Sequence, residues 1–201
     1  MNFDVLIIGG GVAGLQCALV LGSAKEKPFM NDKKIGIVLH QKASHLQNAL
    51  FNNVLGLSPK TMGKDILVEG RNQLTTLYPN VSQIGNEKVL SIEELKGAYI
   101  VVTNKDTYTS KVVIIALNYS KPFTIKGLDT FIAPHEKANP EKDRIQLKNR
   151  AGFMKEGLYC CGTIAGCRSQ FAIAAGSGAA VATDVLTLWN GGNHVKIHDK
   201  V

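Results

Sequence analysis

The stretch that decides the fold is Asp4-Val5-Leu6-Ile7-Ile8-Gly9-Gly10-Gly11-Val12-Ala13-Gly14, close to the start of a 201-residue sequence. Its apolar run, residues 5–8, is typical of a buried parallel strand. The pattern Gly9-x-Gly11-x-x-Gly14 follows at once, and residues 15–21 predict an apolar helix. In this setting the glycines permit a tight turn, close approach of the backbone to a pyrophosphate, and close helix–strand packing. Because a helix N-terminus also attracts phosphates, the stretch predicts a dinucleotide-binding fold.

The residues after the second predicted strand, 35–39, bear on which dinucleotide fits. An acidic residue at this position normally accepts hydrogen bonds from a ribose diol. The sequence has His40-Gln41-Lys42 instead. His40 or Gln41 could still bond a ribose, more weakly, whereas Lys42 could attract a 2′-phosphate. NADP therefore stays open as a ligand.

The remainder of the chain predicts an α/β domain with one parallel sheet and a β-meander. A helix is expected at 64–77, and residues 89–95 fit either a strand or a turn of helix. The other expected elements are strands at 81–84, 98–103, 107–110, 112–116 and 157–162, an irregular connection at 118–150, and a helix at 170–188. Glycines at 176 and 178 inside this last helix suggest that something packs very close to it.

Composition favours a soluble, cytoplasmic protein. Hydrophobic residues make up 45% of the sequence and charged residues 19%, and no apolar run reaches the roughly 18 residues of a membrane span. No leader segment is recognised, so no membrane partner is expected. The net charge of +7 suits an anionic dinucleotide. No nucleic-acid partner is expected, because no binding motif accompanies this charge and aromatic residues are scarce.

The cysteines suggest neither a metal site nor a redox pair. They are Cys17, Cys160, Cys161 and Cys167, with no C-x-x-C spacing and no metal-ligand pattern. Buried, inert thiols are the favoured interpretation. Cys167, in a loop just before the last helix, is the most plausible reactive thiol.

Two distant motifs in the same order resemble the FAD domain of the thioredoxin-reductase-like, FAD-dependent pyridine nucleotide-disulfide oxidoreductase family. The first is residues 4–21, and the second runs from Gly157-Leu158-Tyr159-Cys160-Cys161-Gly162-Thr163 into residues 170–180. Asn53-Val54-Leu55-Gly56 is similar to that family's flavin-side loop. The resemblance implies a Rossmann-like, three-layer FAD/NAD(P)-binding fold. It also implies a single FAD-binding domain over 1–201, in which residues 118–150 replace the family's NAD(P)H domain together with its C-x-x-C redox pair.

The resemblance further implies where FAD would bind. His40 and Gln41 would lie by the adenosine ribose, and Gln170 would face the flavin pyrimidine. The full set of expected cofactor-binding residues is Gly9, Gly11, Val12, Ala13, Gly14, His40, Gln41, Asn53, Gly162, Thr163, Gln170 and Ala174. The chain also departs from the family, with Thr163 in place of an aspartate, Asn118 in place of a glycine, and His40 in place of an acid.

The expected function is that of a flavoprotein oxidoreductase with FAD as its cofactor. Its electrons would come from an external donor, either free NAD(P)H or a partner protein, and a homodimer is expected. No side chain stands out as a catalytic acid or base. Two alternatives stay open: a non-catalytic nucleotide-binding sensor or subunit of the same fold, and an NAD(P)-binding domain.

Overall fold

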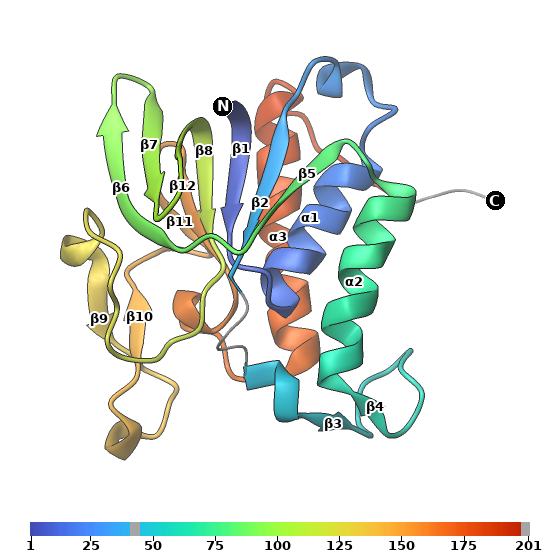
Figure 1. Cartoon of the computed structure of the whole chain (residues 1–201), viewed down its shortest axis with the longest axis vertical. Coiled ribbons are helices and arrows are strands. Elements are labelled where there is room, and N and C mark those ends of the chain that lie inside the picture. Colours follow the sequence, from blue (N-terminus) through green and yellow to red (C-terminus); the bar gives the residue numbers. More distant parts are fainter. Residues whose placement is uncertain (41–44, 198–201) are drawn as a thin grey trace.

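The computed structural model describes residues 1–40 and 45–197, which form an eight-stranded mixed sheet with helices on one face (Figure 1). The sheet's main path runs β11-β12-β8-β1-β2-β5, and all of these strands except the edge strand β11 are mutually parallel. The strands are β1 (Asn2–Ile8), β2 (Ile35–Leu39), β5 (Val81–Gly85), β6 (Val89–Leu95), β7 (Ala98–Thr103), β8 (Thr107–Ile115), β11 (Phe153–Lys155) and β12 (Leu158–Cys160).

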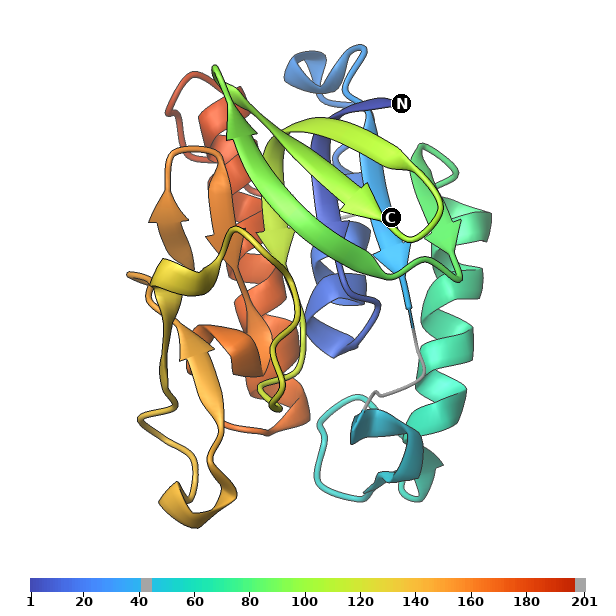
Figure 2. The same ribbon diagram turned by 60° about the vertical axis from the view of Figure 1, so that its left-hand side comes forward.

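The domain has three layers, which confirms the predicted Rossmann-like α/β class. Helices α1 (Val12–Ser23), α2 (Gly63–Leu77) and α3 (Phe171–Trp189) cover one face of the sheet. The meander β6-β7-β8 crosses the other face (Figure 2). Strand β1 is buried on both sides, because Val5 and Ile7 join the core beneath the helices while Leu6 and Ile8 join the core beneath the meander.

Helix α3 packs tightly along α1. A Cβ atom on Gly178 would overlap the carbonyl oxygen of Ala13, so the close packing predicted from the helix glycines is confirmed at this position. Gly176 faces open space, with no atom within 4 Å of its added Cβ. Within the described residues, α3 is the one helix whose length and apolar composition would suffice to cross a membrane. Its contact with α1 and its buried Val181, Ala182, Val185 and Leu186 place it in the helical layer.

One expectation about the middle of the chain is wrong, and one open alternative is resolved. Residues 107–115 form one continuous strand, β8, which both closes the meander and pairs with β1 in the parallel sheet. Residues 89–95 form strand β6 rather than a turn of helix.

The connection at 118–150 is not irregular throughout. It contains the antiparallel pair β9 (Ile132–Pro134) and β10 (Ile145–Leu147). It also contributes Ile125, Leu128, Ile145 and Leu147 to the core beneath the meander. The apolar residues among its prolines and charges are spaced widely, so their burial left no periodic signal in the sequence.

Short elements complete the chain. They are the hairpin β3 (Leu50–Phe51) and β4 (Thr61–Met62), and the 3-10 helices η1 (Pro28–Met30), η2 (His45–Asn48), η3 (Asp129–Phe131), η4 (Pro140–Lys142) and η5 (Gly162–Ala165).

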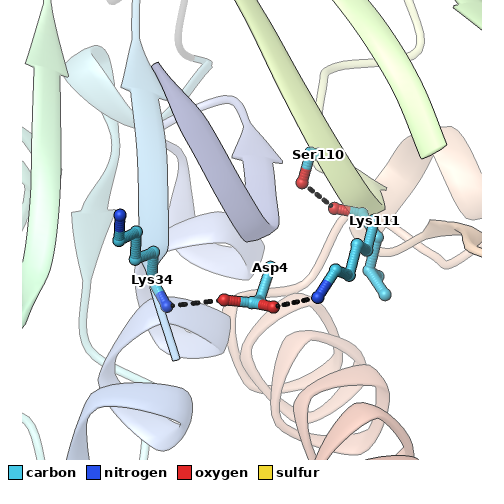
Figure 3. Close-up of polar contacts among 5 residues, drawn as sticks. Asp4, Lys34, Ser110 and Lys111 are labelled. Carbon is cyan, nitrogen blue, oxygen red and sulfur yellow. Dashed lines mark hydrogen bonds and ion pairs between the residues drawn. The ribbon is translucent and has the colours of Figure 1, made fainter. Parts of the chain in front are cut away.

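A half-buried carboxylate, Asp4, ties β1 to its two neighbours (Figure 3). One oxygen accepts a hydrogen bond from the Lys34 backbone N–H at 3.0 Å, and the other pairs with Lys111 Nζ on β8 at 3.0 Å. Burial alone would raise the pKa of Asp4. The hydrogen bonds from Lys34 and Lys111, with the positive charge of Lys111, outweigh burial and lower the pKa below its ordinary value.

We therefore expect D4N to lower the free energy of unfolding at neutral pH by roughly 1–2 kcal/mol, since a hydrogen-bonded charge is lost. Because the folded-state pKa is lowered, this stabilisation is present above the unfolded value of about 4 and is lost as the pH falls below it. Urea unfolding at pH 7 and at stepwise lower pH would measure the difference in free energy of unfolding between the two proteins, which should become smaller as the pH falls. D143N is the matched control, because Asp143 pairs with Lys121 at the surface, where both side chains are more than half exposed. Equal stability of D4N and the unmodified protein at pH 7 would contradict the prediction.

Candidate functional site

A cleft of about 560 Å³ opens at the carboxyl ends of the parallel strands. Residues 9–13 follow β1 into it, His40 follows β2, and Glu87 and Lys88 lie just beyond β5. Residues 116–120 enter it after β8, and Gly162 and Thr163 after β12. In doubly wound sheets, this edge is where ligands bind.

The glycine turn at the centre of the cleft has the geometry that the sequence pattern predicts. Gly9 has φ of +117°, a left-handed conformation that favours glycine. A Cβ on Gly14 would overlap the Gly9 carbonyl oxygen, so only glycine lets α1 approach the strand this closely. Gly11, the N-cap of α1, differs from both: nothing lies within 4 Å of its added Cβ, which would point into open space. The turn is therefore closely packed at Gly9 and Gly14 and open to the cleft at Gly11.

Two helix N-termini meet at the same cleft. Helix α1 enters through Val12 and Ala13, and α3 enters through Gln170, Phe171 and Ala174. The unpaired N–H groups of a first helical turn and the helix dipole favour negative charge in front of each terminus. One elongated anion could therefore contact both ends of the cleft.

The cleft brings together most of the residues predicted for the cofactor site. Those that line it are Gly9, Gly11, Val12, Ala13, His40, Gly162, Thr163, Gln170 and Ala174. Gly14 does not line it, because it is buried behind the turn against Gly9. Gln41 lies outside the described residues.

Asn53 is not among the described residues that line the cleft, and its role in cofactor binding stays a prediction. It is exposed in the loop between β3 and β4. The base of that loop is closed by Asn52 Oδ1, which accepts a hydrogen bond from the Lys60 N–H at 2.8 Å. The hairpin instead presents Phe51 to the cleft, where its ring meets Phe171 edge-on at 5.2 Å between centroids.

Sequence reasoning also missed several residues that line the cleft. Glu87 and Lys88 follow β5, and their position just after a predicted strand was only a partial signal, because the sequence does not show that this strand pairs with β2. Tyr119, Ser120 and others come from the connection that was expected to be irregular.

That connection is built as a wall of the cleft. Asn118 Oδ1 accepts a hydrogen bond from the Ser120 N–H at 3.0 Å, so the residue that departs from the family's glycine closes a turn with its own side chain. The Tyr119 ring contacts both the His135 ring, at 5.2 Å, and the Arg144 guanidinium, at 5.1 Å. His135 Nε2 in turn lies 3.1 Å from the Thr163 carbonyl oxygen. The wall is thus joined to the turn that follows β12.

Three of the cysteines have the inert character expected for them. Cys17, Cys160 and Cys161 are buried, and burial raises the pKa of each thiol, for Cys160 to about 12. They are therefore poor nucleophiles at neutral pH. Cys167 is half-buried and lines a second cavity of about 450 Å³, and its reactivity stays a prediction.

Solved structures with the same fold are thioredoxin reductases and related enzymes. The thioredoxin reductase from Gloeobacter violaceus is 14% identical, with a TM-score of 0.71 over 100% of this chain and 98% of that one. A ferredoxin-flavin thioredoxin reductase from Clostridium acetobutylicum is 17% identical, with a TM-score of 0.69 over 95% and 98% of the two chains. A putative thioredoxin reductase from Bacillus anthracis is 13% identical, with a TM-score of 0.69 over 94% and 99%. No curated protein sequence matches the chain.

The family is shown by a sequence model rather than by these distant folds. The model described as pyridine nucleotide-disulphide oxidoreductase matches residues 3–176, which span the glycine turn, the meander and the start of α3. This chain therefore belongs to the pyridine nucleotide-disulphide oxidoreductase family and is related in fold to thioredoxin reductase.

Proposed function

We propose that the chain binds FAD in the cleft and acts as a single-domain flavoprotein oxidoreductase. The observation that carries this proposal is the cleft itself, which joins the glycine turn of α1 to the N-terminus of α3. We expect a dinucleotide to contact both the glycine turn and the N-terminus of α3, and a mononucleotide to contact only one of them.

The residues present fit such a group. Gly11 leaves open space in front of the α1 terminus, where a diphosphate could approach the backbone. Phe51, Leu117 and Phe171 give the cleft apolar surface, and the volume of about 560 Å³ is in the range of ordinary cofactor sites.

In this proposal the protein binds and tunes the cofactor, and the flavin when bound supplies the electron chemistry. The N-terminus of α3, beside Gln170, would favour negative charge on the ring that faces it. Thr163 has a hydroxyl where the family has a carboxylate, so it would bond a sugar chain more weakly. We assign no catalytic acid or base.

The electrons would come from outside the chain. Residues 118–150 fold as a wall of the cleft, and we propose that they stand in place of the family's NAD(P)H domain. The donor would then be free NAD(P)H or a partner protein in the cytoplasm, with no membrane or nucleic acid involved. The homodimer expected from the sequence stays a prediction.

The first test is the colour of the purified protein. We expect it to show the visible absorption bands of oxidised flavin, or to gain them when it is incubated with FAD and desalted. FMN under the same conditions should be retained poorly, because it lacks the adenosine half. Anaerobic mixing with NADH, NADPH or a reduced electron-transfer protein should then bleach the bands with at least one donor.

Other results would contradict the proposal in distinct ways. FAD binding without bleaching by any reductant would favour the non-catalytic alternative. Binding of NADH or NADPH with no binding of FAD would favour an NAD(P)-binding domain. If the protein is colourless and binds neither FAD, NADH nor NADPH, the proposed function is wrong.

A further inference from the structure

The cleft contains one carboxylate that the sequence analysis did not consider. Among its described lining residues, Glu87 is the only aspartate or glutamate, and it lies two residues beyond the end of β5. His40, at the end of β2, stands where an acid would normally bind a ribose. The cleft thus lacks a carboxylate at the expected strand end and has one at the neighbouring strand end.

The sheet register brings these two strand ends together. Leu39 of β2 pairs with Gly85 of β5, and the Asn86 N–H donates a hydrogen bond to the Leu39 carbonyl oxygen at 3.0 Å. The chain segments that carry His40 and Glu87 therefore leave the sheet side by side. A sugar lying over the end of β2 would lie next to both of them.

The carboxylate of Glu87 is fixed in place by two hydroxyl groups. Thr103 Oγ1 donates to Oε2 at 2.7 Å, and the Tyr108 hydroxyl lies 3.0 Å from Oε2 and 3.1 Å from Oε1. Burial, and then the hydrogen bond to Glu87, raise the pKa of Tyr108 to about 12, so this phenol keeps its proton at neutral pH. These two donors hold the orientation of the carboxylate.

The carboxylate can still accept further hydrogen bonds. An ionised carboxylate accepts about four, and the two hydroxyl protons use only part of that capacity. Glu87 is half-buried and borders the cleft, so we expect its remaining acceptor capacity to be used by a ligand there.

We infer that Glu87 holds the adenosine ribose of the bound nucleotide and selects a free 2′-hydroxyl over a 2′-phosphate. This inference rests on the proposed function and deepens it. A ribose diol donates hydrogen bonds to the carboxylate, whereas a 2′-phosphate would bring a second negative charge against a fixed one. Glu87 therefore replaces the missing acid after β2 and opposes the attraction of a 2′-phosphate by Lys88, which also lines the cleft.

The first experiment changes the ligand and leaves the protein intact. ADP, 2′-deoxy-ADP and 2′,5′-ADP would compete with FAD for the wild-type protein, followed by flavin fluorescence. We expect ADP to compete about tenfold or more better than either of the others, which is the effect of one charge-assisted hydrogen bond. Equal competition by ADP and 2′,5′-ADP would overturn the inference.

The second experiment changes Glu87. E87Q keeps the size of the side chain, and we expect it to weaken FAD binding about tenfold or more and to narrow the preference for ADP over 2′,5′-ADP. E93Q is the matched control, because Glu93 is exposed on β6 outside the cleft and its change removes the same charge. The affinity for FMN should be the same in the wild-type protein, E87Q and E93Q, since FMN has no adenosine ribose.

The outcomes separate this inference from the proposed function. Suppose that the wild-type protein binds FAD and that E87Q has the same affinity for FAD and the same preference for ADP over 2′,5′-ADP. That result would overturn the role of Glu87 and leave the flavoprotein proposal standing. Wild-type protein that binds no dinucleotide would overturn both. Should E87Q fail to fold, equal competition by ADP and 2′,5′-ADP for the wild-type protein would still overturn the inference.

Discussion

Alanine at Gly178 is expected to destabilise the protein strongly, whereas alanine at Gly176 in the same helix should stabilise it. The Cβ of G178A would overlap the Ala13 carbonyl oxygen, and that oxygen belongs to the backbone of α1, so it cannot rotate away. The two helices must separate, at a cost of about 2 kcal/mol or more. G176A meets no atom within 4 Å and gains helix propensity, worth roughly 0.5–1 kcal/mol.

The pair of variants is a controlled comparison, because both make the same change two residues apart in α3. Urea unfolding of each, followed by circular dichroism, gives the two free energies. G178A should have a clearly lower midpoint than the parent protein and G176A a slightly higher one. Similar midpoints for the two variants would show that α1 and α3 do not pack as closely as described.

The elements that could be predicted from the sequence are those whose signals are local. A strand, a glycine turn and a helix follow one another between residues 2 and 23, and each is specified by its own side chains. The same holds for the amphipathic α2 and for β7. The three-layer order was predicted from the family resemblance, and it agrees with the rule that a parallel sheet is covered on both faces.

Features that depend on pairing between distant segments could not be predicted. Glu87 reaches the cleft because β5 pairs with β2, across a gap of more than forty residues, and no local pattern specifies that pairing. In residues 118–150, burial of a few scattered apolar side chains creates order that periodicity does not reveal.

Aspartate at Gly11 should leave the fold intact and abolish FAD binding. Gly11 is the N-cap of α1, with extended backbone angles of −80° and −173° that any residue can adopt. Aspartate is a favoured N-cap and its charge suits the helix dipole, so G11D should be as stable as the parent or up to about 1 kcal/mol more stable. Its carboxylate would occupy the open space in front of the helix, where the proposed diphosphate lies.

Asparagine at the same position separates charge from size. G11N has nearly the same shape and capping ability as G11D but is neutral. We expect G11N to weaken FAD binding through bulk alone, and G11D to weaken it by a further factor of about a hundred, because like charges repel strongly in a partly buried site. This additional factor should shrink as salt is raised. Fluorescence titration with FAD at low and high salt, with unfolding curves to confirm the fold, would measure both effects. Equal affinity of folded G11D and G11N for FAD would mean that no phosphate lies in front of the α1 N-terminus, because a carboxylate beside a bound diphosphate must weaken binding.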